Sequence, residues 1–129
     1  MSFELKPEYI DILQDDIQSG KLDMHIENLN ELHPADLAEI VDKLTPLEGK
    51  DVIEKLDNDK GAEVLIELDE DLRAKILEDY SGKEIAEELV ENLDSDDAAD
   101  LINELPDDRQ KDVLNNIEDP DQAKDLAKN

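Results

Sequence analysis

Apolar residues recur every twelve positions along most of this 129-residue chain. An apolar pair stands eight and nine positions after most of them, as in Ile40–Val41 and Val52–Ile53. Twelve residues are enough for a helix of two to three turns and a tight connection. We therefore expect such a unit to repeat about eight times. The recurring positions, with a slip of one residue after the fifth, are Leu32, Leu44, Leu56, Leu68, Tyr80, Leu93, Leu105 and Ile117.

Residues typical of helix starts follow the recurring positions, for example Thr45-Pro46, Asp57 and Ser81. A side-chain oxygen there can accept a hydrogen bond from the free N–H groups of a new helix, and proline in the first helical position loses no bond. One short helix cannot bury its apolar stripe alone, so neighbouring units must stack. The sequence therefore predicts an all-α protein, an α-solenoid of about ten short helices without a sheet.

The first thirty residues precede the repeats and contain two further helices. The first is expected over 7–17, a break follows at Ser19-Gly20-Lys21, and a short second helix runs over 22–30. No stretch rich in Gly and Ser or in Pro divides the chain. We therefore expect a single domain, 1–129, with the N-terminal helices in about 1–30 and the short-helix repeats in 31–129.

The charge of the chain is extreme, with 39 acidic against 13 basic residues and a formal net charge of −26. This balance argues against nucleic acid or an anionic membrane surface as partner, and it favours cations or basic proteins. Solvation of the helix faces would account for the same residues without any ligand. The apolar runs are far shorter than the roughly 20 residues that span a bilayer, and Met1–Glu4 does not resemble a secretory signal. We expect a soluble, cytoplasmic chain.

Catalysis is not expected, because the residues that enzymes use are scarce. The chain has no cysteine, and its four glycines form no phosphate-binding loop. Neither of the two histidines has a plausible catalytic partner in the sequence. His33 directly precedes Pro34, which predicts a helix cap or a local hydrogen bond, and His25 is expected on a short helix with partial exposure.

The segment from Leu93 to Asp100 holds the densest group of carboxylates. Asp96 and Asp100 are four residues apart, so they project from one helix face, one turn apart. Mg²⁺ binds one or two such carboxylates and retains several waters. Asp94 stands in the capping position and is expected to bond the N–H groups of its own helix. A solvated helix face is the competing interpretation of the Asp96/Asp100 pair.

Four segments, in order and with the same spacing, resemble the N-terminal cytosolic domain of MgtE-type magnesium transporters. Leu32–Glu39 (LHPADLAE) resembles the family's HPADLAE, and Gly61–Leu65 (GAEVL) resembles AAEVL. Leu93–Leu101 (LDSDDAADL) resembles LDPDDAADL, and Glu104–Pro106 matches ELP. Ser95 stands where proline is common, which should alter the helix start and not the ligands. The resemblance covers the chain from about residue 30 to the end.

The resemblance implies a right-handed superhelix of short helices, followed by paired CBS domains and a transmembrane pore that these 129 residues do not include. The whole protein would be a homodimeric magnesium channel, with this domain on the cytoplasmic side of the inner membrane and monomeric when isolated. Mg²⁺ between this domain and the CBS domains would screen facing carboxylates and hold the pore closed. The ligands carried over from the family are Glu63, Asp96 and Asp100, with Asp97 as a nearby candidate.

A protein-interaction module is the alternative. The flagellar switch protein FliG has helical repeats of similar appearance, and armadillo-like solenoids bind partner peptides along a concave face. The strong negative charge would suit a basic partner protein. The magnesium-sensing interpretation is preferred because separate segments match the family in order.

Overall fold

The computed structural model describes residues 6–127, and every regular element within that range is helical. This confirms the prediction of an all-α protein of about ten short helices. The twelve-residue repeat is visible in the helix starts, because α3, α4, α5, α6 and α7 begin twelve residues apart. The helices are α1 (Pro7–Gln18), α2 (Asp23–Asn30), α3 (Pro34–Asp42), α4 (Pro46–Lys55), α5 (Asn58–Glu67), α6 (Glu70–Leu77), α7 (Gly82–Glu84), α8 (Ser95–Asn103), α9 (Asp107–Asn115) and α10 (Pro120–Ala127).

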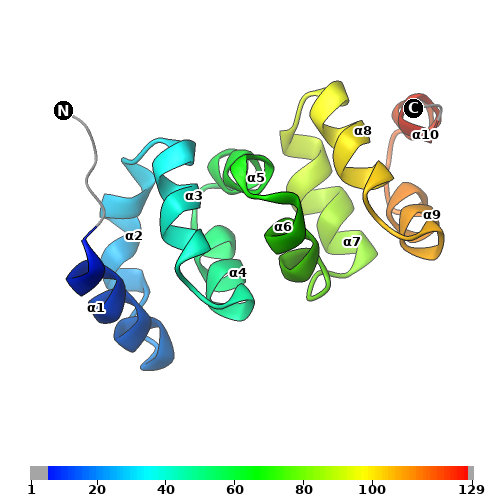
Figure 1. Ribbon diagram of the computed structural model, residues 1–129. Coiled ribbons are helices and arrows are strands. Elements are labelled where there is room, and N and C mark those ends of the chain that lie inside the picture. Colours follow the sequence, from blue (N-terminus) through cyan, green and yellow to red (C-terminus); the bar gives the residue numbers. More distant parts are fainter. Residues whose placement is uncertain (1–5, 128–129) are drawn as a thin grey trace.

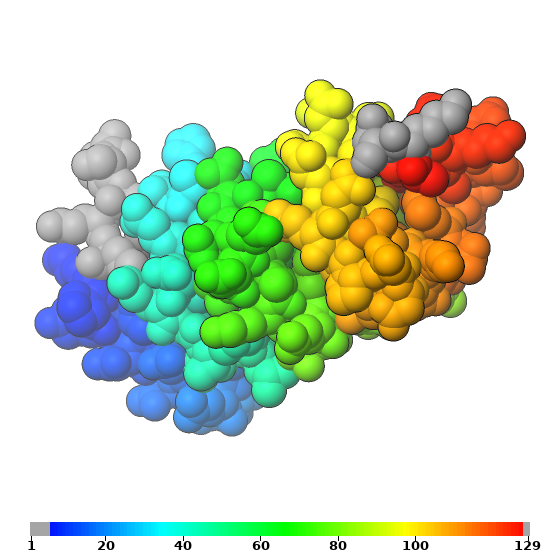
Figure 2. Space-filling view, turned by 45° about the vertical axis from the view of Figure 1, so that its right-hand side comes forward, coloured from blue at the N-terminus to red at the C-terminus, as the bar shows by residue number. Residues whose placement is uncertain are grey.

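The helices follow one another along the length of the molecule, with α1 and α10 at opposite ends (Figure 1). The space-filling view shows the same order, from blue to red (Figure 2). Beyond its neighbour in sequence, a helix packs on the second helix after it: α3 on α5, α4 on α6, α7 on α9 and α8 on α10. Each short helix thus buries its apolar stripe against others, as stacking of the repeats requires.

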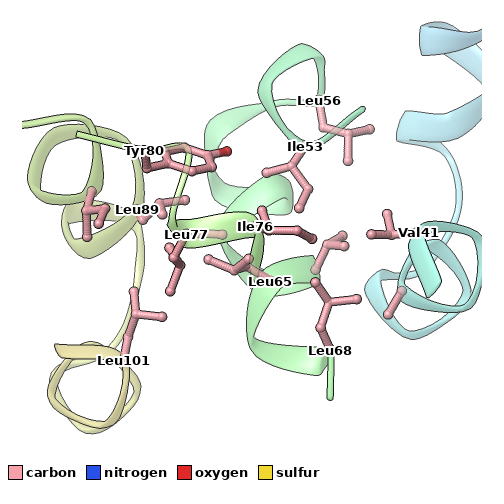
Figure 3. Packing of buried hydrophobic residues seen from close by; sticks show 14 of the residues in the cluster. Val41, Ile53, Leu56, Leu65, Leu68, Ile76, Leu77, Tyr80, Leu89 and Leu101 are labelled. Atoms are coloured by element: carbon pink, nitrogen blue, oxygen red, sulfur yellow. The ribbon is translucent and has the colours of Figure 1, made fainter. Parts of the chain in front are cut away.

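The residues that recur every twelve positions are part of the core. Six of the eight are at most 8% exposed, and Leu32 and Leu93 are partly buried against the same cluster. The apolar pairs lie deeper, since Val64, Leu65 and Ile76 are 0% exposed. Figure 3 shows Leu65 of α5 and Ile76 of α6 between Val41 of α3 and Leu101 of α8. Burial of each large aliphatic side chain contributes about 1.5 to 3 kcal/mol relative to exposure, so the repeat itself holds the stack together.

The one-residue slip in the repeat corresponds to a π-helical turn. α7 continues without a break into the π-turn η1 (Ile85–Leu89) and the 3-10 turn η2 (Val90–Asn92), and we call this continuous element the helix 82–92. A π-turn accommodates an extra residue within a helix. The buried pair of this unit is accordingly Leu89–Val90, one position later than in the other units.

Three basic side chains bind carbonyl oxygens at the ends of earlier helices. Lys60 donates to the carbonyl of Leu32 at 2.9 Å, across 28 residues of sequence. Arg73 and Arg109 do the same at the carbonyls of Leu68 and Tyr80, at 2.8 and 2.6 Å. Cations are favourable there because the last carbonyls of a helix carry partial negative charge. These bonds therefore tie α5, α6 and α9 to the ends of helices that precede them in the chain.

Two of the predicted helix-start residues form capping hydrogen bonds. Thr45 and Ser81 form capping boxes with Glu48 and Glu84, as their spacing suggests. Glu48 is buried and also accepts hydrogen bonds of 3.0 Å from the side-chain amides of Gln14 and Gln18 on α1. Burial alone would raise the pKa of Glu48, but the hydrogen bonds from Thr45 and the two amides outweigh it and lower the pKa.

Three expectations about capping and histidine partners were wrong. His33 and Asp94 occupy N-cap positions, but neither side chain makes the capping hydrogen bond. Both side chains are exposed, so water can satisfy them and the free N–H groups. His25 does have a partner, because its Nε2 lies 2.6 Å from Oδ2 of Asp16. The packing of α2 beside α1 creates this pair, and nothing in the local pattern indicates it.

Candidate functional site

Three of the four predicted ligands lie on one surface formed by α5 and α8. A hollow of about 330 Å³ is lined by Glu63, Ile66 and Glu67 of α5 and by Asp97 of α8, together with residues at the start of α3. A second hollow of about 380 Å³ adjoins it, since Ile66 and Asp97 line both, and includes Asp100. We call Glu63, Ile66, Glu67, Asp97 and Asp100 the α5–α8 surface.

The fourth predicted ligand, Asp96, is exposed on α8 and lines neither hollow. The buried face of α8 consists of Ala98, Ala99, Leu101 and Ile102. Asp97 is adjacent to this face in sequence and is only partly exposed, whereas Asp96 and Asp100 are exposed. Asp97 is the one of these three aspartates that lines both hollows, although the resemblance gave it the least support.

The carboxylates of the α5–α8 surface have no protein partner among the described residues. Within residues 6–127, no hydrogen bond or ion pair engages the side chains of Glu63, Asp97 or Asp100. None of them belongs to a group of three carboxylates with oxygens within 4.8 Å of one another. The surface therefore carries like charges that share a region without forming a cluster of three carboxylates. Such a surface can offer one or two carboxylates to a hydrated divalent cation.

An arginine at the rim of the second hollow braces this surface. Nε of Arg73 donates to Oε2 of Glu104 at 2.8 Å, and its Nη1 donates to the carbonyl of Leu68 at the end of α5. The hydrogen bond to Glu104 raises the pKa of Arg73, and burial partly opposes it. Glu104 follows α8 directly. Arg73 therefore neutralises one carboxylate and links the ends of α5 and α8.

A second acidic cluster was missed in the sequence. Glu54 of α4, together with Glu84 and Glu88 of the helix 82–92, forms a group of three carboxylates with oxygens within 4.8 Å of one another. Carboxylates at such spacings occur throughout the chain, so no single pair stood out. The one available signal is the slip in the repeat, because it marks the irregular helix that carries two of the three residues.

The chain matches one known protein family. The model of that family, described as the MgtE intracellular N domain, matches residues 32–128. No curated protein matches the chain. Over residues 6–127, no helix is both long and apolar enough to cross a membrane. The matched range includes both α5 and α8, and therefore every residue of the α5–α8 surface.

Proposed function

The chain belongs to the family of MgtE intracellular N domains, the regulatory domains of magnesium transporters, and from this premise we propose that its α5–α8 surface senses Mg²⁺ and gates the pore. The family is one of transporter regulatory domains and not of enzymes. The observation that carries the proposal is the placement of Glu63, Asp97 and Asp100. They come from two helices, share one surface, and are unpaired within residues 6–127.

The proposed partners are the CBS domains and the transmembrane pore of a homodimeric full-length protein. Acidic CBS residues would face the α5–α8 surface across a gap that divalent cations fill. Two like charges about 6 Å apart repel by roughly 0.7 kcal/mol in bulk water and by about 3 kcal/mol at an effective dielectric constant near 20. Without cations, this repulsion would separate the two surfaces. Hydrated Mg²⁺ ions held by one or two carboxylates each would remove it.

Gating then follows from differential binding. If Mg²⁺ binds only where the two acidic surfaces meet, it favours the closed pore by the difference in its affinity for the two states. When Mg²⁺ falls, the domain separates and the pore is biased toward opening. Asp96 is exposed on the same helix as Asp97 and Asp100, and we include it as a ligand that faces the partner from outside the two hollows. The isolated domain offers half of each site, so we propose that it binds Mg²⁺ weakly as a monomer.

The arrangement of the short helices as a right-handed superhelix is part of the same proposal. It would present α5 and α8 on one side of the stack, toward the CBS domains. A crystal structure of the full-length protein with Mg²⁺ would test both the handedness and the location of the interface.

The functional test replaces Asp96 and Asp100 with Ala in the full-length protein. Protease protection of the cytosolic region is then measured against Mg²⁺ concentration. We expect the midpoint to move to higher Mg²⁺, because two of the proposed ligands are gone. Asp108→Ala is the matched control, since Asp108 is an exposed aspartate in the first turn of α9. An unchanged midpoint in the double variant would remove Asp96 and Asp100 from the sensor.

A further inference from the structure

The acidic cluster on the helix 82–92 is chemically distinct from the α5–α8 surface. α5 borders both, but through different faces: Asn58, Gly61 and Ala62 line a cavity that also touches Glu54 and Glu88. Glu63 is two residues from Gly61, about 200° around the helix. The two acidic regions are therefore separated by the body of α5.

One oxygen in this cluster is buried without a partner. Oε2 of Glu88 is inaccessible to solvent and makes no hydrogen bond, the single such side-chain atom among residues 6–127. An ionised oxygen in that position destabilises the folded domain, because the charge loses its water and gains no hydrogen bond in return. The adjoining cavity has a volume of only about 10 Å³, at the lower limit for one water. A Mg²⁺ ion that retains several waters does not fit such a space.

The surroundings of Glu88 hold more negative than positive charge. Glu84 and Glu87 come from its own helix, and α4 supplies Glu54 and Lys50. Lys50 is shared, since its Nζ lies 3.3 Å from Glu54 and 4.9 Å from the ring centre of the buried Tyr80. α5 supplies the neutral Asn58. α9 supplies Asp112, but this side chain lies against Gly82, the first residue of the helix 82–92.

We propose that this cluster is a proton switch, in which Glu88 binds a proton in the folded domain and releases it as the pH rises, placing an uncompensated charge between α4 and the helix 82–92. Only a proton moves: it passes between solvent and a Glu88 oxygen, and no other bond changes. Glu54 and Glu84 supply carboxylate oxygens within 4.8 Å to accept a hydrogen bond from the protonated group after small side-chain rotations.

The pKa values of Glu84 and Glu88, the two cluster carboxylates on the helix 82–92, are shifted in opposite directions. Burial raises the pKa of the Glu88 carboxyl, and the charges of Glu54 and Glu84 raise it further, while Lys50 opposes them. The backbone hydrogen bond from Ser81 lowers the pKa of Glu84. Glu84 therefore remains ionised and available as an acceptor at a pH where Glu88 is protonated.

The direction of the pH dependence follows from the raised pKa. The folded domain binds this proton more tightly than the unfolded chain does. Stability from this group is therefore fully present below the pKa of Glu in the unfolded chain, and it is lost as the pH rises through the higher pKa of the folded state. General repulsion among the other carboxylates also increases with pH, so the effect of Glu88 has to be isolated by a variant.

The test compares Glu88→Gln with Glu91→Gln in the 129-residue chain. The first substitution keeps the shape of the side chain and resembles its protonated state, and Glu91 is an exposed glutamate of the same helix. Urea midpoints are measured from about pH 5 to about pH 8 at constant ionic strength. We expect the E88Q midpoint to fall less steeply with pH than the midpoints of wild type and E91Q, and to exceed both at the highest pH.

A second measurement uses the wild-type protein alone, so it does not depend on whether a variant folds. A ¹³C NMR titration of the wild-type carboxyl groups should show Glu88 titrating above the other glutamates. Glu88 titrating in their range, or E88Q and E91Q changing the pH slope equally, would overturn the proposal. So would MgCl₂ stabilising wild type but not E88Q at the highest pH, because the cluster would then hold a cation in place of the proton.

Discussion

The α5–α8 surface and the Glu54–Glu84–Glu88 cluster are built from the same residue type, yet the structure gives them different chemistry. On the α5–α8 surface, the carboxylates line open hollows and have no partner within the described residues. In the cluster, three carboxylates lie close to one another, Lys50 pairs with Glu54, and one oxygen of Glu88 is buried. Exposed, separated carboxylates suit hydrated cations, whereas converging carboxylates with one buried oxygen suit a proton. The spacing and burial of acidic residues, not their number, distinguish the two.

The largest expected effect comes from removing Arg73, which links the ends of α5 and α8 beside the α5–α8 surface. Arg73→Ala deletes the bonds to Glu104 and to the end of α5. We expect a loss of about 2 to 3 kcal/mol in the free energy of unfolding, because charged hydrogen bonds are lost and partly buried acceptors are left unpaired. Urea denaturation measures it. Lys75→Ala on the same helix removes an exposed charge and should cost far less, and equal losses would contradict the bracing role.

The second prediction concerns α5, which borders both the α5–α8 surface and the Glu54–Glu84–Glu88 cluster. A Cβ on Gly61 would lie 2.7 Å from the carbonyl oxygen of Ile53, a backbone atom of α4 that cannot move aside alone. We expect Gly61→Ala to destabilise the domain by about 2 kcal/mol through overpacking, despite the higher helix propensity of Ala.

The control for Gly61→Ala is Glu63→Ala, two residues away on the exposed face of α5. It should change stability by no more than about 0.5 kcal/mol. If Gly61→Ala were neutral in urea denaturation, α4 and α5 would not pack as closely as the structure places them.

The sequence predicted the helices well because one short rule is repeated. Proline at Pro34 and Pro46, and the regular leucines, indicate helix starts and buried positions locally. The slip after Tyr80 was visible, but its outcome was not, since an extra residue can lengthen a loop or form a π-turn. The π-turn at Ile85–Leu89 was resolved by packing against α5 and α9.

The candidate site was only partly predictable. Helix periodicity placed Asp96 and Asp100 on one face, but it gave no reason to prefer Asp97, whose position depends on how α8 meets α5. The Arg73–Glu104 pair joins residues 31 apart, and Glu54 lies 30 residues before Glu84. Contacts at such separations depend on the angles between stacked helices, and a repeat of similar helices does not encode them in its local pattern.

The smallest expected effect concerns the isolated domain and divalent cations. MgCl₂ in the millimolar range should raise the melting temperature more than NaCl of equal ionic strength. Both salts screen the charges, but only Mg²⁺ also binds at a site. At a concentration near the dissociation constant, site binding adds about 0.4 kcal/mol. Combining Glu63→Gln, Asp97→Asn and Asp100→Asn should abolish the difference between the salts. Equal shifts in wild type would indicate screening alone.

The central claim, that the α5–α8 surface and not the proton cluster senses Mg²⁺, is tested most directly in the full-length protein. Protease protection of the cytosolic region is measured against Mg²⁺ for two variants, the triple variant Glu63→Gln, Asp97→Asn, Asp100→Asn and the single variant Glu88→Gln. We predict that the midpoint moves to higher Mg²⁺ in the triple variant and stays at the wild-type value in Glu88→Gln. A wild-type midpoint in the triple variant, or a larger shift in Glu88→Gln, would contradict the account.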